Sequence, residues 1–170
     1  MSILCLGPKS SGKTLLLKKL QNENNVDITS TSVPTVGTNI YTIKHNEYIM
    51  EVREIGGSMA PLWHKYFGGI SIIIYVIDAS NLCQISAAGV LLYTFLANPA
   101  LLYSKILLVL SKSDASYRQM RNEALLMLQM KRLETEINQK ITIVVASAIT
   151  GEGREEILEW IKEQSIRHFH

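Results

Sequence analysis

The chain has 170 residues, of which 47% are hydrophobic and 19% are charged, and its formal net charge is +2. This composition predicts one globular domain, residues 1–170, and argues against disorder. The small net charge and scattered basic residues argue against nucleic-acid binding, and no apolar run reaches the ~20 residues of a membrane span.

The first patterned segment is a strand, a glycine loop and a helix without a gap. Residues 3–6 form an apolar run, residues 7–14 (GPKSSGKT) fit the pattern G-x-x-x-x-G-K-[ST], and an apolar-faced helix begins near Leu15. In such a P-loop, backbone N–H groups and the helix N-terminus converge on a polyphosphate. The alternative is a glycine-bearing strand-to-helix turn with a chance lysine. The P-loop is favoured because the motif and its flanking strand and helix are all present. The expected phosphate-contacting residues are Gly7, Lys9, Ser10, Ser11, Gly12, Lys13 and Thr14. Lys13 is expected to bridge the β- and γ-phosphates, and the Thr14 hydroxyl to bind Mg²⁺.

The rest of the chain alternates between strand and helix patterns. After a polar loop over residues 21–32, β-branched runs predict strands at residues 38–44, 47–54, 70–77, 105–110 and 141–146. Helices are predicted at residues 61–67, 81–97, 116–133 and 153–164, the second capped by Asn81 with Gln84 and the third by Ser116 with Gln119. The histidines have no metal-ligand spacing and are predicted to lie at the surface.

This alternation predicts an α/β fold with a mainly parallel six-stranded sheet and helices on both faces. The hairpin of residues 38–54 would supply its one antiparallel edge strand. Ligands of such sheets bind beyond the carboxyl ends of the strands, so the loops there are expected to share one pocket.

In order and over essentially the whole chain, these loops resemble the nucleotide-binding motifs of small GTPases. The ADP-ribosylation factor branch is resembled in particular by Pro34-Thr35-Val36-Gly37 with Asn39, and by Gly56-Gly57 followed by Pro61-Leu62-Trp63 and Tyr66-Phe67. The resemblance implies a P-loop NTPase of the G-domain type that binds GTP or GDP with Mg²⁺. It further implies a molecular switch that recruits effectors in membrane or ciliary protein traffic.

The resemblance also assigns roles to single residues. Thr14, Thr35 and Glu54 would hold Mg²⁺, with Glu54 at the place of the Walker-B aspartate. Lys13, Thr35, Gly57 and Ser58 would act on the γ-phosphate, and Thr35 and Gly57 would contact it through their backbones. Ser111, Lys112 and Asp114 would bind guanine, with Ser147 and Ala148 closing over the base.

Three departures from the family pattern concern chemistry. Ser58 stands in place of the glutamine that orients the attacking water, and its side chain is too short to reach the same position. Ser111 replaces the asparagine of the guanine motif and so removes an amide that ties the base to the P-loop, and Glu54 is one methylene longer than aspartate. We expect nucleotide binding to survive these changes and intrinsic hydrolysis to be weak.

Partners are expected at residues 21–38 and 55–67, which GTP with Mg²⁺ would order. Two of the three aromatics that the family presents to effectors are replaced, since these positions hold Thr38, Arg53 and Tyr66. Without a myristoylation glycine or prenylation cysteine, membrane contact is expected to be indirect. We expect a monomeric, cytoplasmic protein that is peripheral to membranes or the cilium and has reduced cysteines.

Two alternatives remain open from the residues. Ser58 favours a nucleotide-locked interaction module without useful hydrolysis. A small-molecule P-loop kinase would need an arginine-rich lid, for which Arg118 and Arg121 form the one close pair.

Overall fold

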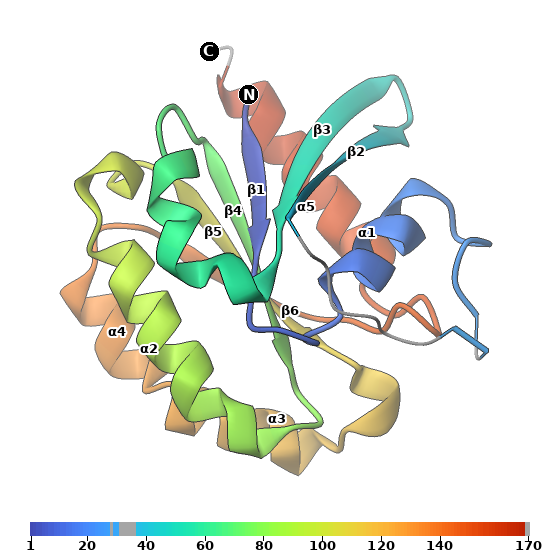
Figure 1. Ribbon diagram of the computed structural model, residues 1–170. Coiled ribbons are helices and arrows are strands. Elements are labelled where there is room, and N and C mark those ends of the chain that lie inside the picture. Colours follow the sequence, from blue (N-terminus) through green and yellow to red (C-terminus); the bar gives the residue numbers. More distant parts are fainter. Residues whose placement is uncertain (28, 31–36, 169–170) are drawn as a thin grey trace.

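The computed structural model describes residues 1–27, 29–30 and 37–168, and its centre is a six-stranded sheet (Figure 1). The strand order is β2-β3-β1-β4-β5-β6. The strands are β1 (Ile3–Leu6), β2 (Thr38–His45), β3 (Tyr48–Ile55), β4 (Ile72–Asp78), β5 (Lys105–Ser111) and β6 (Ile141–Val145). The β2–β3 pair is antiparallel and the other four neighbouring pairs are parallel, which confirms the predicted fold class.

Two hydrophobic cores lie on opposite faces of the sheet because successive strand side chains point in opposite directions. On β1, Leu4 and Leu6 join one core, and Ile3 and Cys5 join the other. Helices α1 (Lys13–Gln21) and α5 (Arg154–His168) cover the second core. The first core is covered by α2 (Ile85–Leu96), α3 (Arg118–Met127), α4 (Met130–Glu136) and the 3₁₀ helix η1 (Gly57–Tyr66).

The predicted helix over residues 116–133 is two helices, because Gln129 has φ 52° and breaks the hydrogen-bonding pattern between α3 and α4. The predicted caps are also wrong. No side chain caps the 3₁₀ helix η2 (Leu82–Gln84) at Asn81, and α3 begins after Tyr117 without a side-chain cap. The short helix predicted at residues 61–67 begins earlier, as η1.

The β2–β3 hairpin turns at Asn46, which has φ 55°, and its end contacts α5. His45, predicted to lie at the surface, is only partly exposed, since its side chain is 11% exposed and its Nε2 lies 2.6 Å from Glu159 Oε1. His64 on η1 is exposed, as predicted. Trp63 and Phe67 are buried in the first core.

The sheet topology places a binding site beyond the carboxyl end of β1. The connection after β1 leads to β2 on one side of β1, and the connection after the neighbouring strand β4 leads to β5 on the other side. A crevice forms at such a point in open α/β sheets. The loops after β1, β3, β4, β5 and β6 therefore meet there.

Candidate functional site

The P-loop joins β1 to α1 in a conformation that suits an anion. Gly7 is packed so closely that an added Cβ would lie 2.3 Å from the Val76 carbonyl oxygen. Ser10 and Gly12 have φ of 63° and 95°. Left-handed residues within a turn point successive N–H groups to one side and so create a concave anion site.

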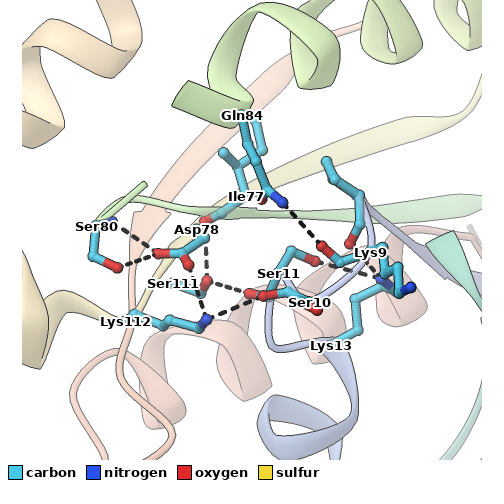
Figure 2. Close-up of polar contacts among 11 residues, drawn as sticks. Lys9, Ser10, Ser11, Lys13, Ile77, Asp78, Ser80, Gln84, Ser111 and Lys112 are labelled. Carbon is cyan, nitrogen blue, oxygen red and sulfur yellow. Dashed lines mark hydrogen bonds and ion pairs between the residues drawn. The ribbon is translucent and has the colours of Figure 1, made fainter. Parts of the chain in front are cut away.

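Three side chains from two other segments hold this loop from outside (Figure 2). The carbonyls of Lys9, Ser10 and Ser11 accept from Gln84 Nε2 (3.4 Å), Lys112 Nζ (3.0 Å) and Ser111 Oγ (2.6 Å), respectively. Each carbonyl shares a planar peptide unit with the next residue's N–H. Fixing three carbonyls therefore fixes the direction of the N–H groups of residues 10–12.

Ser111, which stands where the family has asparagine, links the base motif to the P-loop. The Ser111 hydroxyl is buried and lies 2.6 Å from the Ser11 carbonyl and 3.0 Å from the Ile77 carbonyl. A short side chain suffices because Ser111 is the last residue of β5, directly beside the loop. The link is kept with a hydroxyl in place of an amide.

Lys13 begins α1 and is almost fully buried beneath the loop. Its Nζ donates to the carbonyls of Gly7 (3.0 Å) and Pro8 (2.9 Å) and lies 3.4 Å from Ser11 Oγ. Burial lowers the pKa of Lys13, while Cys5 and Glu54 oppose this shift. The ammonium is thus held within the concave loop, where an anionic phosphate would favour its charged form.

Thr14 and Glu54 form a pair that fits a magnesium ion. The Thr14 hydroxyl donates to Glu54 Oε1 at 2.6 Å, and Glu54 is fully buried. Burial and the neighbouring Glu54 carboxylate raise the pKa of Tyr41, on β2, to about 12. Hydroxyl and carboxylate oxygens are the hard ligands that Mg²⁺ takes alongside phosphate oxygens. The longer Glu54 side chain therefore still reaches the end of the P-loop.

Of the residues expected at the γ-phosphate, Gly57 lies directly on the P-loop. A Cβ on Gly57 would lie 2.2 Å from the Lys9 backbone nitrogen, so any side chain there would collide. Ser58 follows it in the first turn of η1 and is exposed. Thr35 lies outside the described residues.

A cavity of about 170 Å³ opens beside the loop, where a base is expected. It is lined by Gly12, Leu15, Leu16, Ser30, Ser111, Lys112, Asp114, Ala115, Ala148 and Ile149. Asp114 Oδ1 accepts from Ser147 Oγ at 2.7 Å, which orients the carboxylate. The structure thus brings all five predicted base-site residues together, and the leucines and Ile149 add apolar walls for a planar ring.

Sequence reasoning missed Asp78, the last residue of β4. Its carboxylate lies 2.8 Å from Lys112 Nζ and accepts from Ser80. Asp78 pairs in register with Ser111 at the carboxyl end of the neighbouring strand. A lone acid that ends an apolar strand next to the base motif is the signal that points to it.

The expected partner surface differs from an aromatic one in its chemistry. The Arg53 guanidinium lies 5.7 Å from the centre of the Tyr66 ring, within cation–π range. Both residues line a second cavity of about 370 Å³, together with Met1, Ser2, Ile3, Leu4, Ile40, Glu51, Gly68 and Ile70.

Among the described helices, none combines the length and apolarity needed to cross a bilayer.

The sheet order, the P-loop at its switch point and the adjoining cavity define a P-loop protein with the fold of a small GTPase. Residues 1–165 match the ADP-ribosylation factor family. Human ADP-ribosylation factor-like protein 16 is 32% identical over 165 residues, which cover 94% of this chain and 83% of that protein. ADP-ribosylation factor-like protein 1 of Saccharomyces cerevisiae is 30% identical over 172 residues, covering 98% and 90%. The solved structure of the Arl6 BBS3 small GTPase from Trypanosoma brucei, with bound nucleotide analogue GppNp, matches with a TM-score of 0.82 at 20% identity, over 98% of each chain.

The chain belongs to the ADP-ribosylation factor family of small GTPases. Members of this family bind guanine nucleotides as GTP/GDP switches and act through regulators and effectors.

Proposed function

We propose that this chain works as a single G domain that binds GTP and GDP with Mg²⁺ and signals through residues 21–38 and 55–67. The observation that carries the proposal is that one cavity is lined by Gly12 of the P-loop and by Asp114. A nucleotide whose phosphates bind the P-loop would therefore find room for its base in the adjoining cavity. Asp114 would accept from the ring N1–H and the exocyclic amine of guanine, a pattern that adenine lacks.

The chain's own residues have distinct proposed roles. Residues 7–14 cradle the phosphates, Lys13 contacts the β- and γ-phosphates, and Gly57 donates its N–H to the γ-phosphate. Thr14, Glu54 and Thr35 would hold Mg²⁺, which supplies charge neutralisation when bound. Ser147 orients Asp114, and Ala148 closes over the base.

The experiment is chromatography of the nucleotide released from protein purified without added nucleotide, followed by titration of Asp114→Asn. GTP or GDP is expected from the wild type. The variant should lose at least about tenfold in GTP affinity and gain preference for xanthine nucleotides, because a charged acceptor facing the base is worth about 2 kcal/mol. Glu47→Gln makes the same charge change on the exposed hairpin turn and should bind GTP like the wild type. Release of ATP, or unchanged GTP affinity in Asp114→Asn, contradicts the assignment.

A second candidate function is an interaction module that stays loaded with nucleotide and does not hydrolyse it usefully. The exposed Ser58 beside Gly57 favours it, because no long polar side chain follows Gly57. For either candidate we propose slow intrinsic hydrolysis and a cytoplasmic role in membrane or ciliary protein traffic. A pull-down of partners with GTP-loaded and GDP-loaded protein tests the traffic role, and equal recovery in both states contradicts a switch.

A further inference from the structure

Asp78 is a buried carboxylate whose two oxygens serve two different segments (Figure 2). Oδ1 accepts from the Ser80 backbone N–H at 2.8 Å and from the Ser80 hydroxyl at 2.6 Å. Oδ2 lies 2.8 Å from Lys112 Nζ. Ser80 therefore fixes the carboxylate, and the fixed carboxylate faces Lys112.

Lys112 links the P-loop to the base cavity. Its Nζ donates to the Ser10 carbonyl at 3.0 Å, and its side chain lines the base cavity. Its Cε lies 3.7 Å from the place where a Cβ on Gly12 would be, so the stem crosses the P-loop. A lysine side chain is a flexible chain of four methylene groups. The path of the Lys112 side chain across the P-loop is therefore defined only while its ammonium is anchored.

The pairing is poorly explained as a device for stability alone. Removing a carboxylate and an ammonium from water costs free energy that their attraction often does not recover. Lys112 also holds φ 56°, which is uncommon for a residue with a Cβ. Both features are placed at the contact between the P-loop and the base cavity, where a fixed geometry matters for a ligand.

We propose that Asp78 is a positioning residue for nucleotide binding, which acts by anchoring Lys112 across the P-loop and along the base cavity. This inference rests on the proposed function. In this arrangement Ser111 holds the Ser11 carbonyl and the Asp78–Lys112 pair holds the Ser10 carbonyl. Two adjacent peptide units of the loop are thus fixed before a phosphate arrives.

Asp78→Asn tests the proposal because the amide oxygen can still accept from Ser80, while its NH₂ cannot accept from Lys112. We expect GDP and GTP to dissociate about tenfold faster, the loss of one charge-assisted hydrogen bond. The preference for guanine over xanthine nucleotides should not change, since it depends on Asp114. Glu136→Gln removes the carboxylate of the exposed pair with Arg132 and serves as the matched control, expected to behave like the wild type.

A double-mutant cycle separates positioning from a general structural role. The dissociation rate of a fluorescent GDP is measured for the wild type, Asp78→Asn, Lys112→Met and the double variant. If Asp78 acts through Lys112, adding Asp78→Asn to Lys112→Met causes no further loss, or a recovery, because it relieves a buried unpaired charge. A tenfold loss in both backgrounds, or none in the wild-type background, overturns the proposal.

Two further measurements keep the outcomes distinct. If Asp78→Asn does not fold, Ser80→Ala replaces it, since loosening the carboxylate should speed dissociation about twofold to threefold in the wild type and not in Lys112→Met. Fluorescent ADP is measured beside GDP. Binding of ADP alone contradicts the proposed function, while the cycle run with that nucleotide still decides the role of Asp78.

Discussion

Ser111→Ala is the substitution that tests most directly whether the P-loop is held from outside. The hydroxyl has one proton to share between the carbonyls of Ser11 (2.6 Å) and Ile77 (3.0 Å), so the change removes one buried hydrogen bond. Such a loss costs about 1–2 kcal/mol. The thermal midpoint of a domain of this size should fall by about 2–8 °C. Because the lost bond fixes the loop, GDP affinity should fall by about 5- to 30-fold.

Ser104→Ala is the matched control for this change. Ser104 is also buried, and its hydroxyl donates to the Ile70 carbonyl at 2.8 Å, just before β5 begins and away from the P-loop. Both variants should lose similar stability in thermal melts, while titration with GDP should show a loss of affinity in Ser111→Ala alone. Equal GDP affinity in the two variants would refute the reasoning, because the hydroxyl would then act on the fold and not on the loop.

Three further changes have separate expected outcomes. Lys13→Ala should abolish measurable GTP binding in calorimetric titration, since its buried ammonium is the cation placed inside the loop; wild-type affinity would contradict this. Gly57→Ala should lower the free energy of unfolding by about 1–3 kcal/mol in urea, because its Cβ would meet the P-loop backbone at 2.2 Å, and an unchanged midpoint would show that the loop yields. The hydrogen bond from His45 lowers the pKa of Glu159, so this pair contributes stability above the unfolded-state pKa of about 4.3 and loses it as the pH falls. Glu159→Gln should remove that part of the acid dependence in melts between about pH 3 and 6.

The strands and the P-loop were predictable because their signals are local. Residues 72–77 of β4 are all buried, and a continuous apolar run suits that environment. The P-loop pattern demands glycine at Gly7, where the Val76 carbonyl leaves no room for a Cβ. Steric requirements of this kind are visible in the residue types themselves.

The missed features depend on neighbours that are distant in sequence or on a single dihedral angle. The residue types around Gln129 do not predict its left-handed conformation, which divides the predicted third helix. The Asp78–Lys112 pair exists because β4 and β5 are parallel neighbours in a particular register. The sequence shows only that Ser111 lacks the asparagine amide of the family. Its position beside the P-loop in the structure shows that a serine hydroxyl is long enough to reach the Ser11 carbonyl.

Ser58 is a second position where the length of a side chain decides the chemistry. Phosphoryl transfer to water needs charge balance at the phosphate and a group that aligns the water. The P-loop and Lys13 address the first need. Ser58 begins the exposed surface of η1 next to Gly57, and a glutamine there would extend its polar group two covalent bonds further from the backbone.

We therefore expect single-turnover assays with radiolabelled GTP to give a wild-type rate at or below the ~10⁻⁴ s⁻¹ scale of an unassisted GTPase. Ser58→Gln should hydrolyse GTP as fast as or faster than the wild type. Ser58→Leu, whose side chain is similar in size to glutamine but cannot hydrogen-bond water, should not be faster than the wild type. If the wild type hydrolyses GTP rapidly and Ser58→Ala leaves the rate unchanged, another residue aligns the water. Lys9, whose backbone touches Gly57, Glu54 at the end of β3 and the exposed His64 on η1 would then be the side chains to replace, since each lies on a segment that borders the expected γ-phosphate position.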